Sequence, residues 1–113
     1  MAVEIGDPQG VSWETVEALV DTASTYTWIP RELLERLGIQ SEYRVEFETA
    51  DGRVIERDMV QTRARLYGQE RITIVVFGNQ GDSVLLGAYT LEGFALAPDP
   101  VNQRLIRVRG LAM

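Results

Sequence analysis

Alternation of polar and apolar residues in the middle of the chain limits the fold more than any other feature. Residues 43–48 read YRVEFE and residues 60–67 read VQTRARLY, a period of two that is typical of antiparallel strands with one buried face. Asp51-Gly52 follows the first of these segments and is the strongest short-range signal for a β-hairpin. Residues 71–77, RITIVVF, are apolar and β-branched enough for a central strand. The chain is therefore predicted to be mainly β, as one barrel or sandwich.

Two short helices are predicted to interrupt the strands. Pro30 suits a first helical position and Gly38 a C-terminal stop, so one helix is expected between them. A second, of one or two turns, is expected at residues 88–92 before Gly93, and a last strand at residues 104–108. The residues of the first helix that are expected to face the core are Leu33, Leu34 and Leu37.

Length and composition exclude several classes of function. At 113 residues the chain is expected to be one domain, residues 1–113. A net charge of −6, with basic residues scattered among acidic ones, argues against a nucleic-acid partner. No apolar stretch is long enough to cross a membrane and no signal peptide is visible, so the expected location is cytoplasmic.

The absence of cysteine and histidine narrows the chemistry further. Without them the chain has no thiol nucleophile, no serine-triad base and no zinc-thiolate site, and no nucleotide-binding glycine motif is present. No cofactor and no metal are therefore expected. Any acid–base chemistry has to come from carboxylates.

One carboxylate lies in a suggestive place. Asp21 begins the segment Asp21-Thr22-Ala23-Ser24, directly after the apolar run that includes Leu19 and Val20. If that run is a buried strand, the carboxylate at its end is poorly hydrated and needs a partner. Asp21 is therefore the first candidate for a reactive group.

Four segments in order resemble a retroviral-type aspartic protease, a retropepsin-like domain of clan AA. Val20–Ser24 is similar to the catalytic loop of that family, apolar-Asp-Thr/Ser-Gly. The hairpin with Ala50-Asp51-Gly52-Arg53 at its tip lies where the family has its flap, and Val84–Gly87 resembles the segment before the family's C-terminal helix. Residues 94–105 are similar to the tail of small cellular and bacterial members, so the resemblance covers residues 3–108.

The resemblance implies a retropepsin-like acid-protease barrel that acts as a homodimer on peptide or protein substrates. Asp21 would be the catalytic residue, one from each subunit, because the reaction needs two carboxylates and the chain has one such loop. Thr22 would hydrogen-bond across the dimer, and Ser24 would hydrogen-bond the outer oxygen of Asp21. The aspartates that lack the sequence context for a second loop are Asp51, Asp58, Asp82 and Asp99.

The remaining implied roles concern the walls of the site. Leu86 and Gly87 would pack beside the catalytic loop. Tyr26 and Trp28 are interpreted as core or pocket wall rather than chemistry. The flap, which would close over the substrate and exclude water, would have its tip at Ala50, Asp51, Gly52 and Arg53.

Two positions depart from the family pattern. Ala23 stands where most members have glycine, and a methyl group there can crowd or twist the loop. Ala88-Tyr89 follows Gly87, where the family commonly has Arg and then Asp or Asn, so ion pairs that tie the family's dimers together are not expected here.

Two alternatives stay open on the sequence. A catalytically inactive peptide-binding or interaction module of the same fold would also fit, since fold does not fix function. A metal site formed by Glu46, Glu48 and Asp51 is disfavoured, because solvated charges on an exposed strand face explain these residues more simply.

Overall fold

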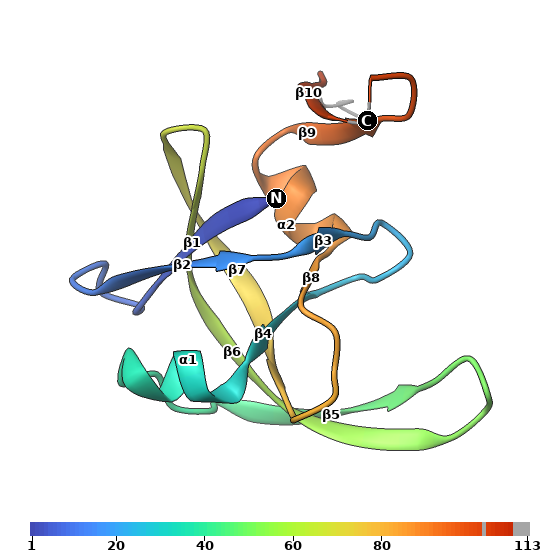
Figure 1. Cartoon of the computed structure of the whole chain (residues 1–113). Helices are drawn as coiled ribbons and strands as arrows, with labels where there is room; N and C mark the ends of the chain where they lie inside the picture. The colour runs from blue at the N-terminus through green and yellow to red at the C-terminus, as the bar shows by residue number, and fades with distance from the viewer. Residues whose placement is uncertain (103, 110–113) are drawn as a thin grey trace.

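The structure is a computed structural model and describes residues 1–102 and 104–109 (Figure 1). The elements in chain order are β1 (Ala2–Gly6), β2 (Trp13–Glu17), β3 (Leu19–Val20), β4 (Thr27–Pro30), α1 (Arg31–Arg36), β5 (Tyr43–Glu48), β6 (Val54–Leu66), β7 (Gln69–Gly78), β8 (Leu85–Leu86), α2 (Ala88–Gly93), β9 (Leu96–Asp99) and β10 (Arg104–Arg107). The predictions of a mainly β chain and of two short helices are confirmed.

An eight-stranded sheet carries most of the fold. Its strands follow the order β2–β1–β6–β7–β4–β8–β3, and β5 pairs with β6 off this path. The prediction of a closed barrel is wrong for the described residues, because the sheet does not close on itself. Its two ends, β2 and β3, follow each other in the chain with Ala18 between them, so the covalent chain rather than a ladder of hydrogen bonds joins them.

The hairpin of β5 and β6 is the longest projection from the sheet. Tyr43 pairs with Met59 at its base and Glu48 with Val54 at its end, and residues 49–53 form the turn. The predicted hairpin at Asp51-Gly52 is thus confirmed, with Gly52 in the left-handed region at φ 84°. We call β5, the turn and residues 54–58 of β6 the flap hairpin; it extends to the lower right in Figure 1.

β6 is longer than the sequence pattern indicates. Its 13 residues join the hairpin signal and the alternating segment after it into one strand. Arg57 and Asp58 lie between these two segments, and the strand accommodates both charges because each residue has an ion-pair partner elsewhere. Arg57 contacts Asp82, and Asp58 contacts Arg31.

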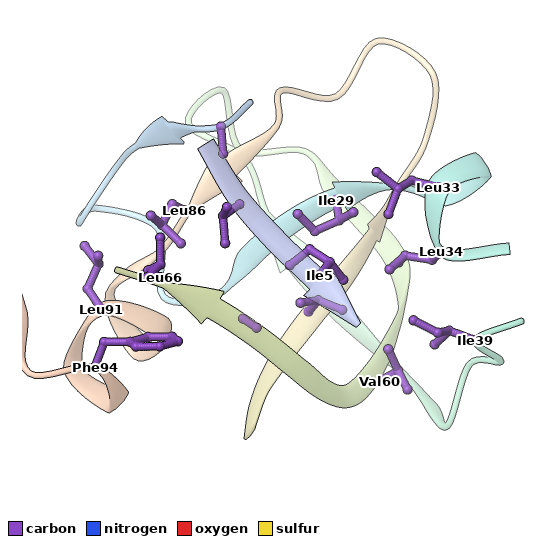
Figure 2. Packing of buried hydrophobic residues seen from close by; sticks show 14 of the residues in the cluster. Ile5, Ile29, Leu33, Leu34, Ile39, Val60, Leu66, Leu86, Leu91 and Phe94 are labelled. Atoms are coloured by element: carbon purple, nitrogen blue, oxygen red, sulfur yellow. The ribbon is translucent and has the colours of Figure 1, made fainter. Parts of the chain in front are cut away.

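The core lies between the sheet and the two helices, and Figure 2 shows how its side chains meet. Ile5 and Ile29 from the sheet, Leu34 from α1 and Leu91 from α2 are essentially inaccessible to solvent. α1 begins after Pro30, which is the N-cap and not the first helical residue, and Gly38 at φ 74° follows its end. Leu33 and Leu34 are buried as predicted, and Leu37 is partly buried against the same cluster.

The last strands form a separate two-stranded sheet. β9 and β10 pair antiparallel, with Arg104 opposite Asp99 and Arg107 opposite Leu96. This C-terminal hairpin lies beyond α2, at the top of Figure 1. The predicted last strand is confirmed to within one residue at its end.

Candidate active site

Asp21 follows a short parallel strand pair. β3 pairs with β8, with Val20 opposite Leu86. The Asp21 N–H then donates to the Leu86 carbonyl over 3.0 Å. The aspartate is therefore placed by backbone hydrogen bonds immediately beyond the ladder.

Residues 21–26, which we call the Asp21 loop, fold back onto the aspartate. The Ala23 N–H donates to Asp21 Oδ1 over 3.0 Å and the Ser24 N–H to the Asp21 carbonyl over 3.1 Å. The Ser24 hydroxyl donates to the Tyr26 carbonyl over 2.8 Å. The prediction that the Ser24 hydroxyl binds the Asp21 carboxylate is therefore wrong for this structure, because the hydroxyl donates to the Tyr26 carbonyl instead.

The strand before Asp21 is more exposed than expected. The sequence predicts a buried strand there, but Leu19 is 68% exposed and Val20 37%. The reason is that β3 is an edge strand of two residues, paired with β8 on one side. Asp21 itself is half-buried, so in the single chain its carboxylate reaches solvent.

Gly87 lies against the Asp21 loop. A Cβ atom at residue 87 would be 2.3 Å from the Tyr26 carbonyl oxygen and 2.9 Å from that of Ser24. The next two N–H groups bind the same loop, since Ala88 donates to the Ser24 carbonyl over 2.8 Å and Tyr89 to the Thr25 carbonyl over 2.9 Å. Glycine at this position lets α2 begin directly on the loop.

A buried chain of hydroxyl groups supports this contact. The Gly87 N–H donates to Thr27 Oγ1 over 3.0 Å. Thr90 Oγ1 lies 2.7 Å from Thr27 Oγ1 and 2.7 Å from Thr73 Oγ1, and all three threonines are essentially inaccessible. The chain joins β4, α2 and β7 behind the Asp21 loop. The sequence did not predict these hydrogen bonds, because the residues around a threonine do not indicate which distant groups its hydroxyl will contact.

Ala23 fits the loop without backbone strain. The non-glycine residues with positive φ in the described part of the chain are Tyr67 and Ala95, so Ala23 is outside the region that favours glycine. Its side chain is exposed, as is that of Thr22. Nothing in the loop of a single chain therefore requires glycine at residue 23.

The Asp21 loop separates two hollows on the surface. The larger, of about 700 Å³, is lined by Asp21, Thr22 and Ala23 together with Tyr67 and parts of the C-terminal hairpin. The smaller, of about 330 Å³, lies between the same loop and the flap hairpin. The residues that line the smaller hollow are Ala23, Ser24, Thr25, Tyr26, Trp28, Phe47, Glu48, Thr49 and Ile55.

The tip of the flap hairpin is held by its own contacts. Asp51 accepts hydrogen bonds from the Thr49 hydroxyl and, over 3.0 Å, from Arg53 Nε. The Thr49 hydroxyl and the Arg53 groups hold the pKa of Asp51 below its usual value. Ala50, Asp51, Gly52 and Arg53 do not line either of the two hollows beside the Asp21 loop.

The acidic residues do not gather into a metal site. Within residues 1–102 and 104–109, no group of three or more carboxylates could hold a metal ion, and Glu46, Glu48 and Asp51 form no such group. No helix of the described residues is long and apolar enough to span a membrane. The cytoplasmic location stays a prediction.

Comparison with known families supports the resemblance. A family model described as aspartyl protease matches residues 1–90, a range that includes the Asp21 loop, the flap hairpin and Gly87. The matched range ends before the tail at residues 94–105. A comparison with curated proteins finds no match. Because the family model covers well over half of the chain, the protein belongs to the aspartyl protease family, of the retropepsin type.

Proposed function

We propose that this protein is a homodimeric aspartic endopeptidase in which Asp21 of each subunit supplies one of two catalytic carboxylates. The observation that carries the proposal is the position of Asp21. It lines the larger hollow, and its loop is fixed by β8 and by the start of α2. A reactive carboxylate needs this combination of access and rigid support.

The exposure of the neighbouring residues supports a symmetric partner. Leu19 and Val20, directly before Asp21, are 68% and 37% exposed, and Tyr67 beside the same hollow is 58% exposed. Large exposed apolar side chains near a candidate catalytic group are typical of a surface that another chain covers. A two-fold axis beside this loop would bring the two Asp21 carboxylates together.

The chemistry follows from the repulsion of two neighbouring carboxylates. They cannot both be ionised at low cost, so the pair keeps one proton and titrates as a unit. The ionised member would take a proton from a water molecule as that water attacks the peptide carbonyl. The protonated member would donate to the developing oxyanion.

Two further elements would complete the site. Thr22, next to Asp21, is exposed in the single chain. In the dimer it would hydrogen-bond to the partner subunit and hold the two Asp21 loops in register. The flap hairpin would close over the bound peptide through its tip, residues 50–53, and exclude water. Leu86 and Gly87 would act as packing residues that hold the Asp21 loop in place.

The test is cleavage of a mixed library of unstructured peptides at roughly pH 3 to 7, the range in which a carboxylate pair should titrate. Asp21→Asn is expected to abolish cleavage. Glu92→Gln, which removes one exposed negative charge from α2, is the matched control and should keep it. Cleavage that persists in the Asp21→Asn protein would refute the assigned role.

Mixing the two proteins tests the dimer. If each site needs one Asp21 from each chain, excess Asp21→Asn protein will lower the activity of the parent by forming mixed dimers, whereas excess Glu92→Gln protein will not. A folded and dimeric parent without any cleavage would instead favour the inactive peptide-binding module.

A further inference from the structure

The peptide group that joins Leu86 to Gly87 holds both ends of the Asp21 loop. Its carbonyl accepts a hydrogen bond from the Asp21 N–H over 3.0 Å, at the start of the loop. Its N–H donates over 3.0 Å to Oγ1 of Thr27, the first residue after the loop. A peptide group is planar and rigid, with its C=O and N–H on opposite sides. One flat unit therefore connects the first residue of the loop with the residue that follows it.

This peptide group is buried and fixed by its place in the fold. Leu86 is the last residue of β8, which lies between β3 and β4 in the sheet, and α2 begins directly after Gly87 (Figure 1). Leu86 is inaccessible to solvent and Gly87 is buried. Because water is largely excluded here, a polar group that loses its partner has no ready substitute.

Thr27 is the anchor of the loop that depends on a side chain. The other hydrogen bonds that the structure describes between the Asp21 loop and residues 86–89 join main chain to main chain. Any residue except proline can supply the N–H of such a bond, and any residue can supply the carbonyl. The bond at Thr27 instead needs a side-chain acceptor. The residue type at position 27 therefore decides whether the Gly87 N–H has a partner.

Two further threonines orient the Thr27 hydroxyl. Its oxygen accepts the Gly87 N–H, so its own proton is directed elsewhere, and Thr90 Oγ1 lies 2.7 Å away. Thr90 can pass its proton in the same direction to Thr73 Oγ1, also over 2.7 Å. In that arrangement each of the three oxygens accepts one hydrogen bond. Hydrogen bonds in such a buried chain polarise one another, which strengthens the bond at Gly87.

Loss of the Thr27 hydroxyl would allow the peptide group to turn. The Gly87 N–H would be buried without a partner, and the cost of that state favours a local rearrangement. Because the peptide group is rigid, a turn that brings the N–H to a new acceptor also moves the Leu86 carbonyl away from Asp21. The Asp21 carboxylate would shift with its own backbone. A displacement of about 1 Å can lower a reaction rate about 100-fold.

We propose that Thr27 is a positioning residue of the active site, which sets the place of the Asp21 carboxylate through the peptide group of Leu86 and Gly87. The inference rests on the proposed function and adds to it a residue that lines neither hollow beside the Asp21 loop. In this role Thr27 does not touch the substrate. Its effect is therefore expected on the rate of the chemical step and not on peptide binding.

Steady-state cleavage of one peptide substrate tests the role. Thr27→Val keeps the shape of the side chain and removes the hydroxyl, so kcat should fall about 100-fold while KM stays close to that of the parent. Thr27→Ser keeps the hydroxyl and should retain most of kcat. Thr62→Val is the matched control and should keep the kcat of the parent. Thr62 is also a buried strand threonine, but its hydroxyl donates to the Gly6 carbonyl and it lines neither hollow.

Hydrogen exchange measures the same role without any cleavage. In the Thr27→Val protein the Asp21 and Gly87 N–H groups should exchange at least about tenfold faster than in the Thr62→Val protein, because the bonds on both sides of one peptide group weaken together. Thermal unfolding shows whether each variant is folded. If Thr27→Val is not, Thr90→Val, which removes the acceptor of the Thr27 hydroxyl, should show the same pattern in weaker form.

The outcomes separate this role from the proposed function. An equal fall of kcat in Thr27→Val and Thr62→Val, a Thr27→Ser protein no more active than Thr27→Val, or a change confined to KM would overturn the positioning role. Equal exchange at Asp21 in the folded Thr27→Val and Thr62→Val proteins would also overturn it. A parent without any cleavage would refute the endopeptidase, and the exchange rates would still decide whether Thr27 fixes the loop.

Discussion

Gly87 and Tyr26 are in such close contact that residue 87 has no room for a side chain. The 2.3 Å between a Cβ atom at residue 87 and the Tyr26 carbonyl oxygen is far below any ordinary contact, and the obstacle is backbone rather than a flexible side chain. The start of α2 and the Asp21 loop can therefore meet only through glycine. This contact determines where the loop lies relative to β8.

Gly87→Ala is expected to destabilise the protein by about 1–3 kcal/mol, the usual cost of forcing extra atoms into a packed site. Peptide cleavage should fall more steeply than stability, because the Asp21 loop has to move. Gly93→Ala is the matched control within the same helix. A Cβ atom there meets nothing within 4 Å, so the change should be neutral or slightly stabilising. Equal melting temperatures for the two variants would contradict the close approach.

The hydroxyl chain behind the loop gives a second prediction. Thr90→Val keeps the shape of the side chain but leaves Thr27 and Thr73 without their shared partner, at a cost of about 1–3 kcal/mol for an unsatisfied buried group. Thr90→Ser keeps the hydroxyl and loses one methyl group, about 1 kcal/mol. Chemical denaturation of both should rank Val below Ser. The reverse order would show that the methyl group matters more than the hydrogen bonds.

The sequence predicted the parts of the fold that local patterns encode. Alternation indicated β5 and the second half of β6, and β-branched apolar residues indicated β7. Asp51-Gly52 indicated the hairpin, and Gly38 indicated the end of α1. Each of these signals acts through residues that are near one another in the chain. The segment at Asp21 could also be recognised locally, because the motif that resembles the family's catalytic loop is one short uninterrupted stretch of sequence.

What the sequence did not predict depends on partners far along the chain. β3 was expected to be buried, but its exposure follows from its place at the edge of the sheet. The Ser24 hydroxyl binds the Tyr26 carbonyl instead of Asp21, which only the path of the loop determines. The Thr27–Thr90–Thr73 chain joins residues up to 63 positions apart, and no local pattern indicates such contacts.

The flap hairpin should depend on the ion pair of Arg57 and Asp82. Arg57 Nε lies 2.8 Å from Asp82 Oδ2, with both side chains largely buried, and joins β6 to the loop after β7. Asp82→Asn removes the charge and should cost about 1–3 kcal/mol at neutral pH. Hydrogen exchange should then accelerate in residues 43–58. Glu46→Gln, exposed on β5, is the control and should not change it.

The same pair predicts a pH dependence of stability. The Arg57 guanidinium holds the pKa of Asp82 below its ordinary value of 3.8. The ionised group is therefore favoured in the folded state, and its contribution is complete above that ordinary value and lost as the pH falls through the lowered pKa. The difference in unfolding free energy between the parent and Asp82→Asn should be constant near neutral pH and shrink in strong acid. A difference that grows on acidification would refute the assignment.

Ala23 provides the last prediction, because glycine is the usual residue of the family at this place. The backbone of Ala23 is outside the positive-φ region and its side chain is exposed, so the methyl group adds no strain in the single chain. Ala23→Gly should therefore lower the free energy of unfolding by about 0.4–1 kcal/mol, because glycine raises the conformational entropy of the unfolded chain, which is lost on folding. Thermal unfolding at several protein concentrations separates this effect from a change in dimer formation. A gain in stability that grows with protein concentration would show instead that the methyl group crowds the partner's loop, and cleavage by Ala23→Gly should then exceed that of the parent.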